Sequence, residues 1–287
     1  MERFTRIWNA LLTPGALVLL GLFLVPLALV VVFSFGTVDI LGRPVLGFTT
    51  DNYSQVFQSY NLPAVWRTVL FSLATTAICV ALAYPVAYYC VRFAGRLGPV
   101  IIVAVVAPWL VDYLVRIYAW RTLLSDGGII NNLLGDVGLG QVHVLGTSWA
   151  VILGLVYGYL PLMILPLYAT LGTFDFRLVE AGKDLYGTPR AVFAHVTLPA
   201  SRPGIVGGCL LVFLPVLGDF ATAQFLGGPN TTMAGNLIAS QFTEAGAQTV
   251  GAAFAVVLIV LLVATLALTF GLARRGLAAA ATAGAAA

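Results

Sequence analysis

Six long apolar stretches limit what this chain can fold into more than any other feature of its sequence. A helix of about 20 apolar residues crosses the hydrocarbon core of a bilayer, which is about 30 Å thick. The stretches lie at 11–35, 64–91, 99–120, 148–171, 205–226 and 250–273. With 60% hydrophobic and only 9% charged residues, the composition excludes an ordinary soluble domain, in which about 25% of residues are charged. We therefore expect an all-α integral membrane protein with about six transmembrane helices.

The longest polar interruption with a helical pattern of its own lies between the fourth and fifth stretches, at 172–204. The apolar residues of its first half recur at helical spacing, and they are Phe174, Leu178, Ala181 and Leu185. Asp175 is placed to cap this helix. Thr188-Pro189 then supplies a capping residue and a proline suited to a first helical position. We expect two short amphipathic helices joined by a turn at 186–188, the second ending at Leu198-Pro199.

The distribution of basic residues predicts the orientation of the chain, because short cytoplasmic segments carry an excess of Lys and Arg. With six spans, both termini and the 172–204 loop share one face. That face holds ten of the 14 basic residues: Arg3, Arg6, Arg92, Arg96, Arg177, Lys183, Arg190, Arg202, Arg274 and Arg275. We therefore expect a cytoplasmic N-terminal segment at 1–10, a transmembrane domain at 11–273 and a cytoplasmic tail at 274–287.

The 172–204 loop resembles the signature loop of the permeases of binding-protein-dependent, type I ABC importers. That signature has a Glu-Ala-Ala triplet, a glycine a few residues later, and an aliphatic residue shortly before Leu-Pro. The matching positions are Glu180-Ala181-Gly182, and Val196 before Leu198-Pro199. Gly182 stands where the triplet has its second alanine, and Tyr186 stands at the glycine position with Gly187 directly after it. We call residues 172–204 the coupling loop, after the helix pair that couples such permeases to their ATPase.

The resemblance extends to stretches 108–120, 127–135 and 208–220, which look like the spermidine/putrescine branch of these permeases. It implies a type I importer transmembrane domain that forms half of the translocation path for a small solute, with a polyamine as the expected cargo. An aminophosphonate, thiamine or an amino-acid-like compound is the alternative cargo. It also implies a multi-pass protein of the bacterial inner (cytoplasmic) membrane.

The resemblance further implies partners that handle ATP. Lys183 is followed by Asp184, so the chain lacks the Gly-x4-Gly-Lys-Ser/Thr phosphate cradle. ATP and magnesium are expected on two copies of a cytoplasmic ABC ATPase. A second homologous permease and a periplasmic or lipid-anchored binding protein complete the expected complex in membrane lipids. We expect no enzyme activity, no catalytic residue, no cofactor or metal in this chain, and no nucleic-acid partner.

Coupling to the ATPase is assigned by resemblance to residues on both helices of the loop. They are Leu178, Glu180, Ala181, Gly182, Asp184, Leu185, Gly187, Val196 and Pro199. The alternative is that the helix pair lies on the inner leaflet of the membrane. Arg177, Lys183 and Arg190 suit a lipid surface, whereas Glu180 and Asp184 dilute its positive charge.

Charges inside the expected spans are costly in lipid and are therefore candidates for the substrate path. Asp219 follows Pro215 and Gly218, which interrupt the fifth span. It either attracts a cationic cargo, or it caps the outer end of the span or pairs with a basic group on the partner subunit. Asp112 and Arg116 are four residues apart in the third span and either pair with each other or contact substrate. Trp109, Tyr113 and Trp120 beside them suit either a cation–π contact with an amine or an aromatic belt at the membrane interface.

Two rival classes of function remain at this point. An ion-coupled carrier would be driven by a gradient without an ATPase, and it usually shows internal repeats and acidic residues deep within spans. A membrane enzyme would need a nucleophile motif, paired carboxylates or a metal-ligand cluster, and none is present in the sequence. Association with an ATPase distinguishes the importer from both.

Overall fold

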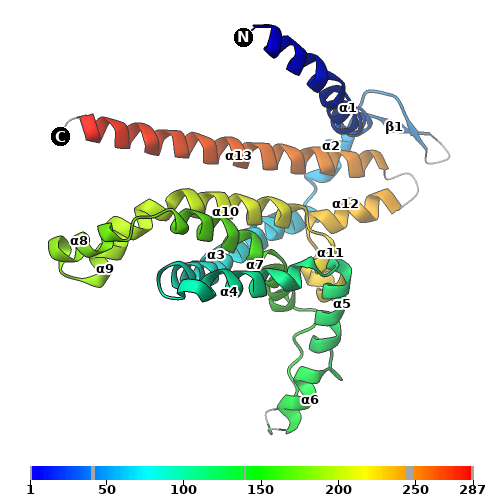
Figure 1. Cartoon of the computed structure of the whole chain (residues 1–287). Coiled ribbons are helices and arrows are strands. Elements are labelled where there is room, and N and C mark those ends of the chain that lie inside the picture. The colour runs from blue at the N-terminus through cyan, green and yellow to red at the C-terminus, as the bar shows by residue number, and fades with distance from the viewer. Residues whose placement is uncertain (1, 40–42, 137, 139, 244–247, 286–287) are drawn as a thin grey trace. The chain divides into compact units, whose positions relative to one another are not determined.

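The computed structural model describes residues 2–39, 43–136, 138, 140–243 and 248–285. At 2–11, 186, 268, 270 and 272–285 it describes the backbone alone. The chain divides into two compact units (Figure 1). Unit 1 comprises residues 1–62 and 237–261, and unit 2 comprises residues 63–236 and 262–287.

Unit 1 is built from two long helices with short elements between them. Its elements are α1 (Glu2–Ser34), β1 (Thr37–Val38), β2 (Pro44–Val45), α2 (Asp51–Val56), most of α12 (Ala234–Thr243) and the first part of α13 (Gln248–Ala285). The strands form an antiparallel hairpin in which Thr37 faces Val45. The core of the unit contains Val56, Ala253 and Phe254. The Asn52 amide joins α2 to the end of α1 by donating 2.9 Å hydrogen bonds to the carbonyl oxygens of Ser34 and Gly36.

Unit 2 contains the remaining elements. They are α3 (Leu62–Arg92), η1 (Gly95–Leu97), α4 (Gly98–Val106), η2 (Ala107–Leu110), α5 (Tyr113–Leu124), α6 (Ile129–Asp136), α7 (Ser148–Gly172), α8 (Arg177–Tyr186), α9 (Pro189–Val192), η3 (Phe193–Thr197), α10 (Leu198–Gly218), α11 (Ala221–Leu226) and η4 (Pro229–Thr231).

The helices confirm the expected membrane character. In the described part of the chain, five helices are long and apolar enough to cross a membrane. They are Leu12–Ser34, Leu62–Arg92, Ser148–Gly172, Pro189–Gly218 and Gln248–Ala267. A bent pair, Gly95–Leu110 with Tyr113–Asp136, brings the number to six if it counts as one span.

The third expected span is not the continuous helix predicted at 99–120. The helix stops after Leu110, and the two arms meet at an angle of 91°. Val111 and Asp112 adopt extended ψ angles of 143° and 140°. The Asp112 side chain then accepts hydrogen bonds from the backbone N–H groups of Leu114 and Val115, which caps α5. An N-cap residue lies outside the helix, so Asp112 begins a new helix instead of continuing the old one.

The fifth span also differs from the predicted range 205–226. Helix α10 ends at Gly218, Asp219 is extended with ψ 125°, and α11 begins anew at Ala221. The predicted interruption is therefore confirmed at Gly218 and Asp219, whereas Pro215 lies inside α10 and does not interrupt it. At its other end the helix continues beyond the expected start, because the residues before Leu198 are already helical.

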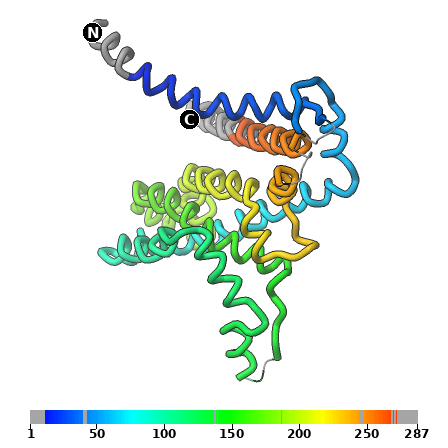
Figure 2. Tube along the Cα trace, turned by 90° about the vertical axis from the view of Figure 1, so that its right-hand side faces the viewer, coloured from blue at the N-terminus to red at the C-terminus, as the bar shows by residue number. Residues whose placement is uncertain are grey.

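Helices α7 and α10 pack closely and run side by side in both views (Figures 1 and 2). Gly204 and Gly208, four residues apart on α10, face α7. A Cβ atom at Gly204 would lie 2.7 Å from Oγ1 of Thr170. One at Gly208 would lie 3.3 Å from the carbonyl oxygen of Met163. Small residues at this spacing let two membrane helices approach closely, so the glycines set the α7–α10 distance.

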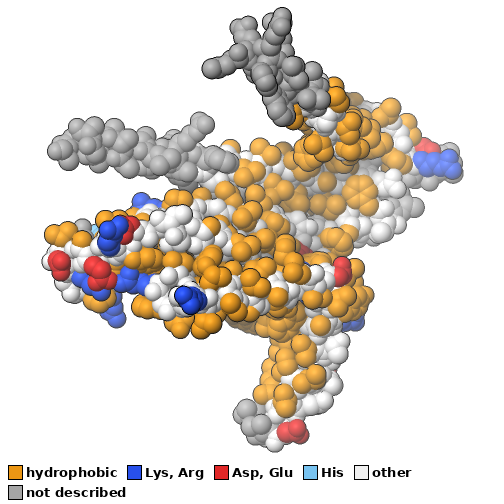
Figure 3. All heavy atoms as spheres, viewed as in Figure 1, with side chains coloured by type: hydrophobic (Ala, Val, Ile, Leu, Met, Phe, Trp, Pro, Cys, Tyr) orange, Lys and Arg blue, Asp and Glu red, His pale blue; other side chains and the backbone are white. Residues whose placement is uncertain are grey.

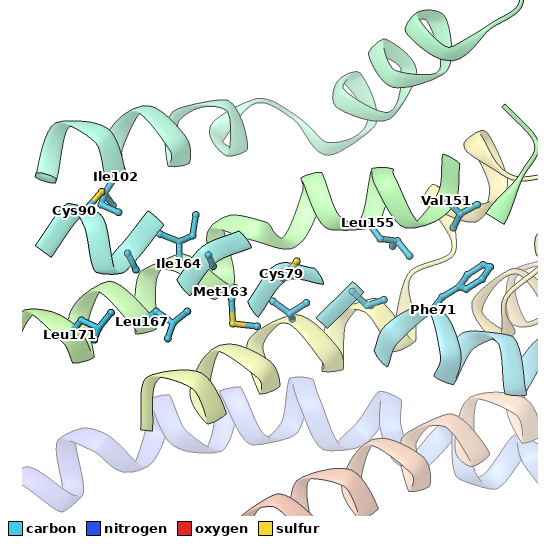
Figure 4. Packing of buried hydrophobic residues seen from close by; sticks show 14 of the residues in the cluster. Phe71, Cys79, Cys90, Ile102, Val151, Leu155, Met163, Ile164, Leu167 and Leu171 are labelled. Carbon is cyan, nitrogen blue, oxygen red and sulfur yellow. The ribbon is translucent and has the colours of Figure 1, made fainter. Parts of the chain in front are cut away.

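The core of unit 2 lies among α3, α7 and α10, with a contribution from α4. Figure 4 shows labelled members of this core, including Cys79, Leu155 and Met163, which are fully buried. Cys79 and Cys90 are buried free thiols, and Cys209 is partly buried. This packed core supports the two regions that carry the candidate site residues, the coupling loop and the break after α10.

Candidate functional site

The coupling loop contains the two short helices that the sequence predicts. Oδ1 of Asp175 accepts a 3.0 Å hydrogen bond from the backbone N–H of Arg177 at the start of α8. Gly187 ends α8 in the left-handed conformation with φ +67°, which glycine adopts without steric cost. Oγ1 of Thr188 accepts a 3.3 Å hydrogen bond from the N–H of Ala191, and Pro189 occupies the first turn of α9. The predicted cap at Thr188 is confirmed, whereas the N-cap position of α8 is Phe176 and Asp175 lies one residue before it.

Helix α8 packs onto the next helix through a small residue. Val179 is buried and Gly182 is buried beside it. A Cβ atom at Gly182 would lie 3.2 Å from the Cγ atoms of both Val192 and Val196. The departure from the Glu-Ala-Ala triplet at this position therefore brings α8 close to α9 and η3.

The side of α8 next to this buried face presents apolar side chains that nothing in the described chain covers. Leu185 is 80% exposed and Leu178 is 54% exposed, and Ala181 is exposed between them. Figure 3 shows charged side chains gathered mainly at this end of unit 2, whereas apolar side chains cover most of the rest of the visible face. An uncovered apolar strip within a polar end is a feature of protein-interaction surfaces.

The second loop helix does not end at Leu198-Pro199 as the sequence predicts. A π turn, η3, runs from Phe193 to Thr197 and leads directly into α10. The π turn ends two residues before Pro199, which lies in the first turn of α10, where a residue without an N–H donor is tolerated. Val196 is partly buried within this turn. The loop and the span from 189 to 218 are therefore one helical rod, and only α8 is a separate element.

Glu180 is held within its own chain. Its Oε1 forms an ion pair with Nη2 of Arg92 at the end of α3. Its Oε2 accepts a 2.9 Å hydrogen bond from Nζ of Lys183. The hydrogen bond from Lys183, and next that from Arg92, hold the pKa of Glu180 below the ordinary glutamate value. The carboxylate therefore stays charged at neutral pH. Asp184, the other acid of α8, is exposed.

A cleft of about 230 Å³ lies between the end of α3 and the coupling loop. Its wall combines aromatic, aliphatic and basic side chains: Tyr88, Arg92, Phe93, Val179, Lys183, Pro189, Val192, Phe193 and Thr197. Of the α3 residues in this wall, Arg92 was predicted only as a basic residue of the cytoplasmic face, and Tyr88 was not predicted to have a role. The signal was available, because Tyr84, Tyr88 and Arg92 recur every four residues at the end of the second span.

The second candidate region surrounds Asp219, whose residue is 6% exposed. Oδ1 accepts a 2.9 Å hydrogen bond from the N–H of Thr222, so the side chain caps the break before α11. Oδ2 accepts hydrogen bonds from the hydroxyls of Tyr113, of Tyr159 at 2.9 Å and of Thr222 at 3.0 Å. The carboxylate therefore joins α5, α7 and the start of α11.

Asp112 and Arg116 do not pair with each other in the described structure. Asp112 is used as the cap of α5, and the Arg116 guanidinium lies over the ring of Tyr113, with Cζ 5.6 Å from the ring centroid. Nε of Arg116 is buried without a hydrogen-bond partner. The face of the Tyr113 ring, which was predicted to receive a cationic amine, is thus occupied by the Arg116 guanidinium of the same chain.

The structure separates the three aromatic residues that the sequence grouped. Trp109 lies in η2 before the bend and is 37% exposed, whereas Tyr113 reaches Asp219. Trp120 packs edge-on against Tyr157 with ring centroids 5.3 Å apart. Among the described residues, no group of three His, Cys, Asp or Glu side chains is placed to hold a metal ion.

Comparison with known proteins identifies the family. Residues 80–275, which include the coupling loop and both arms of the Asp219 break, match the family described as binding-protein-dependent transport system inner membrane component. The chain belongs to this family. The spermidine/putrescine transport system permease protein PotB of Haemophilus influenzae is 37% identical over 83% of this chain and 84% of its own length. The Escherichia coli protein of the same description is 31% identical over 83% of this chain and 87% of its own.

Solved structures of similar fold agree with this membership. A chain of the bacterial alginate ABC transporter, solved in complex with an alginate-bound periplasmic protein, aligns with a TM-score of 0.77. It is 17% identical, and the alignment covers 96% of each chain. The chain is thus a multi-pass inner-membrane permease of the type I ABC class, within the spermidine/putrescine branch by sequence. Relatives are named as transport permeases, so this permease is a transport subunit and not an enzyme.

Proposed function

We propose that this permease is a subunit of an ATP-driven importer and forms half of its translocation path. The observation that carries the proposal is the uncovered apolar strip of α8, formed by Leu178, Ala181 and Leu185. It lies in the loop whose sequence resembles the ATPase-coupling signature of the family, with departures at Gly182 and Tyr186. An apolar helix face of this kind fits a groove on a partner protein. Glu180, Gly182, Asp184, Gly187, Val196 and Pro199 complete the proposed coupling element.

The partners follow from the same loop. Two copies of a cytoplasmic ABC ATPase, each with ATP and magnesium, would receive the coupling loops of this chain and of a second homologous permease. A periplasmic or lipid-anchored binding protein would deliver the solute to the opposite face. The excess of basic residues on the side of the termini supports a cytoplasmic position for both termini and for the coupling loop.

The proposed mechanism is alternating access. Closure of the two ATPase subunits on ATP moves α8, and the continuous rod from α9 through α10 carries that displacement into the membrane. Because α10 packs closely against α7, the two helices move together. The path would then open toward the binding protein and reset after ATP hydrolysis.

The proposed cargo is a polyamine. Relatives that are 31–37% identical carry the name spermidine/putrescine transport system permease protein. Asp219, Asp112, Trp109, Tyr113 and Trp120 remain the candidate path residues. The hydroxyls of Tyr113 and Tyr159 both donate hydrogen bonds to the Asp219 carboxylate. A cationic solute would therefore contact this carboxylate only after one of the two tyrosines moves away. An aminophosphonate, thiamine or an amino-acid-like compound is the alternative cargo.

The coupling role is tested by placing a charge on the apolar strip. Leu185→Glu should reduce the amount of ATPase that co-purifies with the permease, because a carboxylate cannot enter an apolar groove without cost. Leu46→Glu is the matched control, since Leu46 is 74% exposed in unit 1, outside the coupling loop. Equal ATPase recovery with Leu185→Glu and with the unmodified chain would contradict the proposed docking surface.

The cargo is tested by measuring the ATPase activity of the reconstituted complex with its binding protein. Spermidine, putrescine, amino acids, thiamine and aminophosphonates are compared at equal concentration. Stimulation by a polyamine is the expected result. Stimulation by another solute alone would keep the importer and reject the polyamine, whereas gradient-driven uptake without any ATPase would favour an ion-coupled carrier.

A further inference from the structure

The last residue of α3 contacts the coupling loop in two ways. The Arg92 guanidinium pairs with Glu180, and its Cζ lies 4.9 Å from the ring centroid of Phe176 at the start of α8. The Arg92 side chain is only 19% exposed, whereas that of Glu180 is 56% exposed. A partly buried cation over an aromatic face is less screened by water and salt than an exposed pair. Arg92 is therefore the fixed partner of this contact, and α8 is the element it holds.

Two tyrosines extend the same contact along α3. Tyr88 meets Phe176 edge-on with ring centroids 6.0 Å apart. One turn earlier, Tyr84 meets Phe193 of η3 edge-on at 5.5 Å, and its hydroxyl lies 3.0 Å from Oγ of Ser201 on α10. Residues spaced by four share a face of a helix. One face of α3 therefore touches the coupling loop at three successive levels.

The three α3 residues contact different parts of the coupling loop. Tyr84 reaches the α9–α10 rod, which continues into the membrane whether or not Tyr84 is present. Helix α8 is different, because Gly187 separates it from that rod by a left-handed turn. Its contacts with α3 depend on Tyr88 and Arg92. Arg92 alone combines an ion pair with a ring contact, and both its partners, Phe176 and Glu180, belong to the α8 segment.

We propose that Arg92 is a positioning residue that transmits displacement of α8 to α3, giving the permease a second route from the coupling loop into the membrane beside the α9–α10 rod. This inference rests on the proposed function for its direction, since the displacement originates at the ATPase. The contact itself belongs to this chain alone. Helix α3 contributes Cys79, Ala83 and Ala87 to the core of unit 2, so a shift of α3 reaches α7 and α10.

The first experiment tests the contact without any partner. Hydrogen–deuterium exchange is measured on the full chain in lipid nanodiscs for the unmodified protein, Arg92→Ala and the control Arg96→Ala. Arg96 is an exposed arginine four residues further on, with no ion pair in the described structure. Arg92→Ala should raise exchange of the α8 amides by about two- to fivefold, the scale of one cation–π contact at a partly exposed site. Unchanged exchange of α8 in Arg92→Ala would overturn the proposal, whatever the partners prove to be.

The second experiment tests transmission in the complete importer. Arg92→Ala should retain its ATPase subunits and its basal ATP hydrolysis, while solute transported per ATP hydrolysed falls severalfold. Arg92→Lys keeps the charge and should restore part of this ratio, because lysine reaches Glu180 but cannot reproduce the planar stack on Phe176. An unchanged ratio in Arg92→Ala would overturn the proposal. Loss of ATPase binding in Arg92→Ala would also overturn it, because Arg92 would then only shape the docking surface.

The two experiments distinguish a failure of the proposed importer function from a failure of the role proposed for Arg92. If the unmodified chain binds no ATPase, the proposed function fails, and the exchange measurement still decides whether Arg92 holds α8. If the unmodified complex couples transport to hydrolysis and Arg92→Ala does so equally well, the importer stands and the α3 route is rejected.

Discussion

The hydroxyl of Tyr159 donates a 2.9 Å hydrogen bond to Oδ2 of Asp219 and thereby ties the middle of α7 to the break after α10. Tyr113 donates to the same oxygen from α5. A charged acceptor with several donors is a strong junction where water is scarce. The break in the fifth span is thus held to the neighbouring helices through the Asp219 side chain.

Asp219→Asn should lower the stability of the permease by about 1.5–3 kcal/mol, the usual value of a hydrogen bond to a charged group. The amide keeps one acceptor oxygen, but its NH₂ group cannot accept a hydrogen bond from Tyr159 or Thr222. Thermal unfolding of the purified chain in detergent measures the change. Tyr159→Phe removes a single donor and should cost no more than Asp219→Asn. A normal unfolding temperature for Asp219→Asn together with lost uptake of a cationic solute would instead assign Asp219 to the substrate path.

Gly182→Ala should be close to neutral for stability, whereas Gly182→Leu should disrupt the coupling loop. Alanine gains about 0.8–1 kcal/mol of helix propensity over glycine. This gain offsets a Cβ atom placed 3.2 Å from the methyl groups of Val192 and Val196, which must move by a few tenths of an ångström. A leucine overfills the same space, which typically costs about 1–3 kcal/mol.

Thermal unfolding and co-purification of the ATPase measure both Gly182 variants. Gly187→Ala provides a contrast, because its cost comes from the left-handed φ of +67° and not from crowding. Normal ATPase recovery with Gly182→Leu would show that the close packing of α8 on α9 is dispensable for coupling.

The ionisation of Glu180 should follow the contacts of the coupling loop. Lys183 and Arg92 lower the pKa of the carboxyl in the folded chain. Its stabilising contribution is therefore complete above the ordinary glutamate pKa and is lost as the pH falls through the lowered, folded-state value. We expect the coupling loop to keep these contacts throughout the neutral range and to lose them only in acid.

A carboxyl-carbon NMR titration of Glu180 checks this expectation directly. The midpoint should lie below the ordinary glutamate value and should rise in Lys183→Ala and in Arg92→Ala. Arg190→Ala is the matched control, since Arg190 makes no ion pair with Glu180 in the described structure. A wild-type midpoint at the ordinary value would show that neither cation holds the carboxylate in solution.

Much of the coupling loop could be predicted from local sequence. The cap at Thr188, the hydrogen bond from Arg177 N–H to Asp175 and the turn at Gly187 depend on neighbours within a few residues. The break near Gly218 was also predictable, because glycine and a short acidic side chain favour the end of a helix. The continuation of α10 through Pro199 was not, because a π turn depends on packing and not on the residues it contains.

The bend at Asp112 shows how a local pattern can support two structures. A spacing of four residues between Asp112 and Arg116 permits an ion pair within a continuous helix. The same aspartate is a good N-cap, and a cap requires that the helix begin there. In the structure Asp112 caps α5 and does not pair with Arg116, whose guanidinium lies over the ring of Tyr113 instead. Sequence alone offered no way to rank these two uses of one side chain.

The sequence by itself determined that this chain is a helical membrane protein with an amphipathic coupling loop. Hydropathy and helical spacing act over neighbouring residues, and a helix in lipid must satisfy its own backbone. Only the tertiary structure decided which polar groups meet. Arg92 and Glu180 are 88 residues apart, and Tyr159 and Asp219 are 60 apart. The packing of α3, α7 and α10 brings such pairs together. For Asp219, which is 6% exposed, this is essential, because a buried charge is stable only where the fold places its partners within hydrogen-bonding distance.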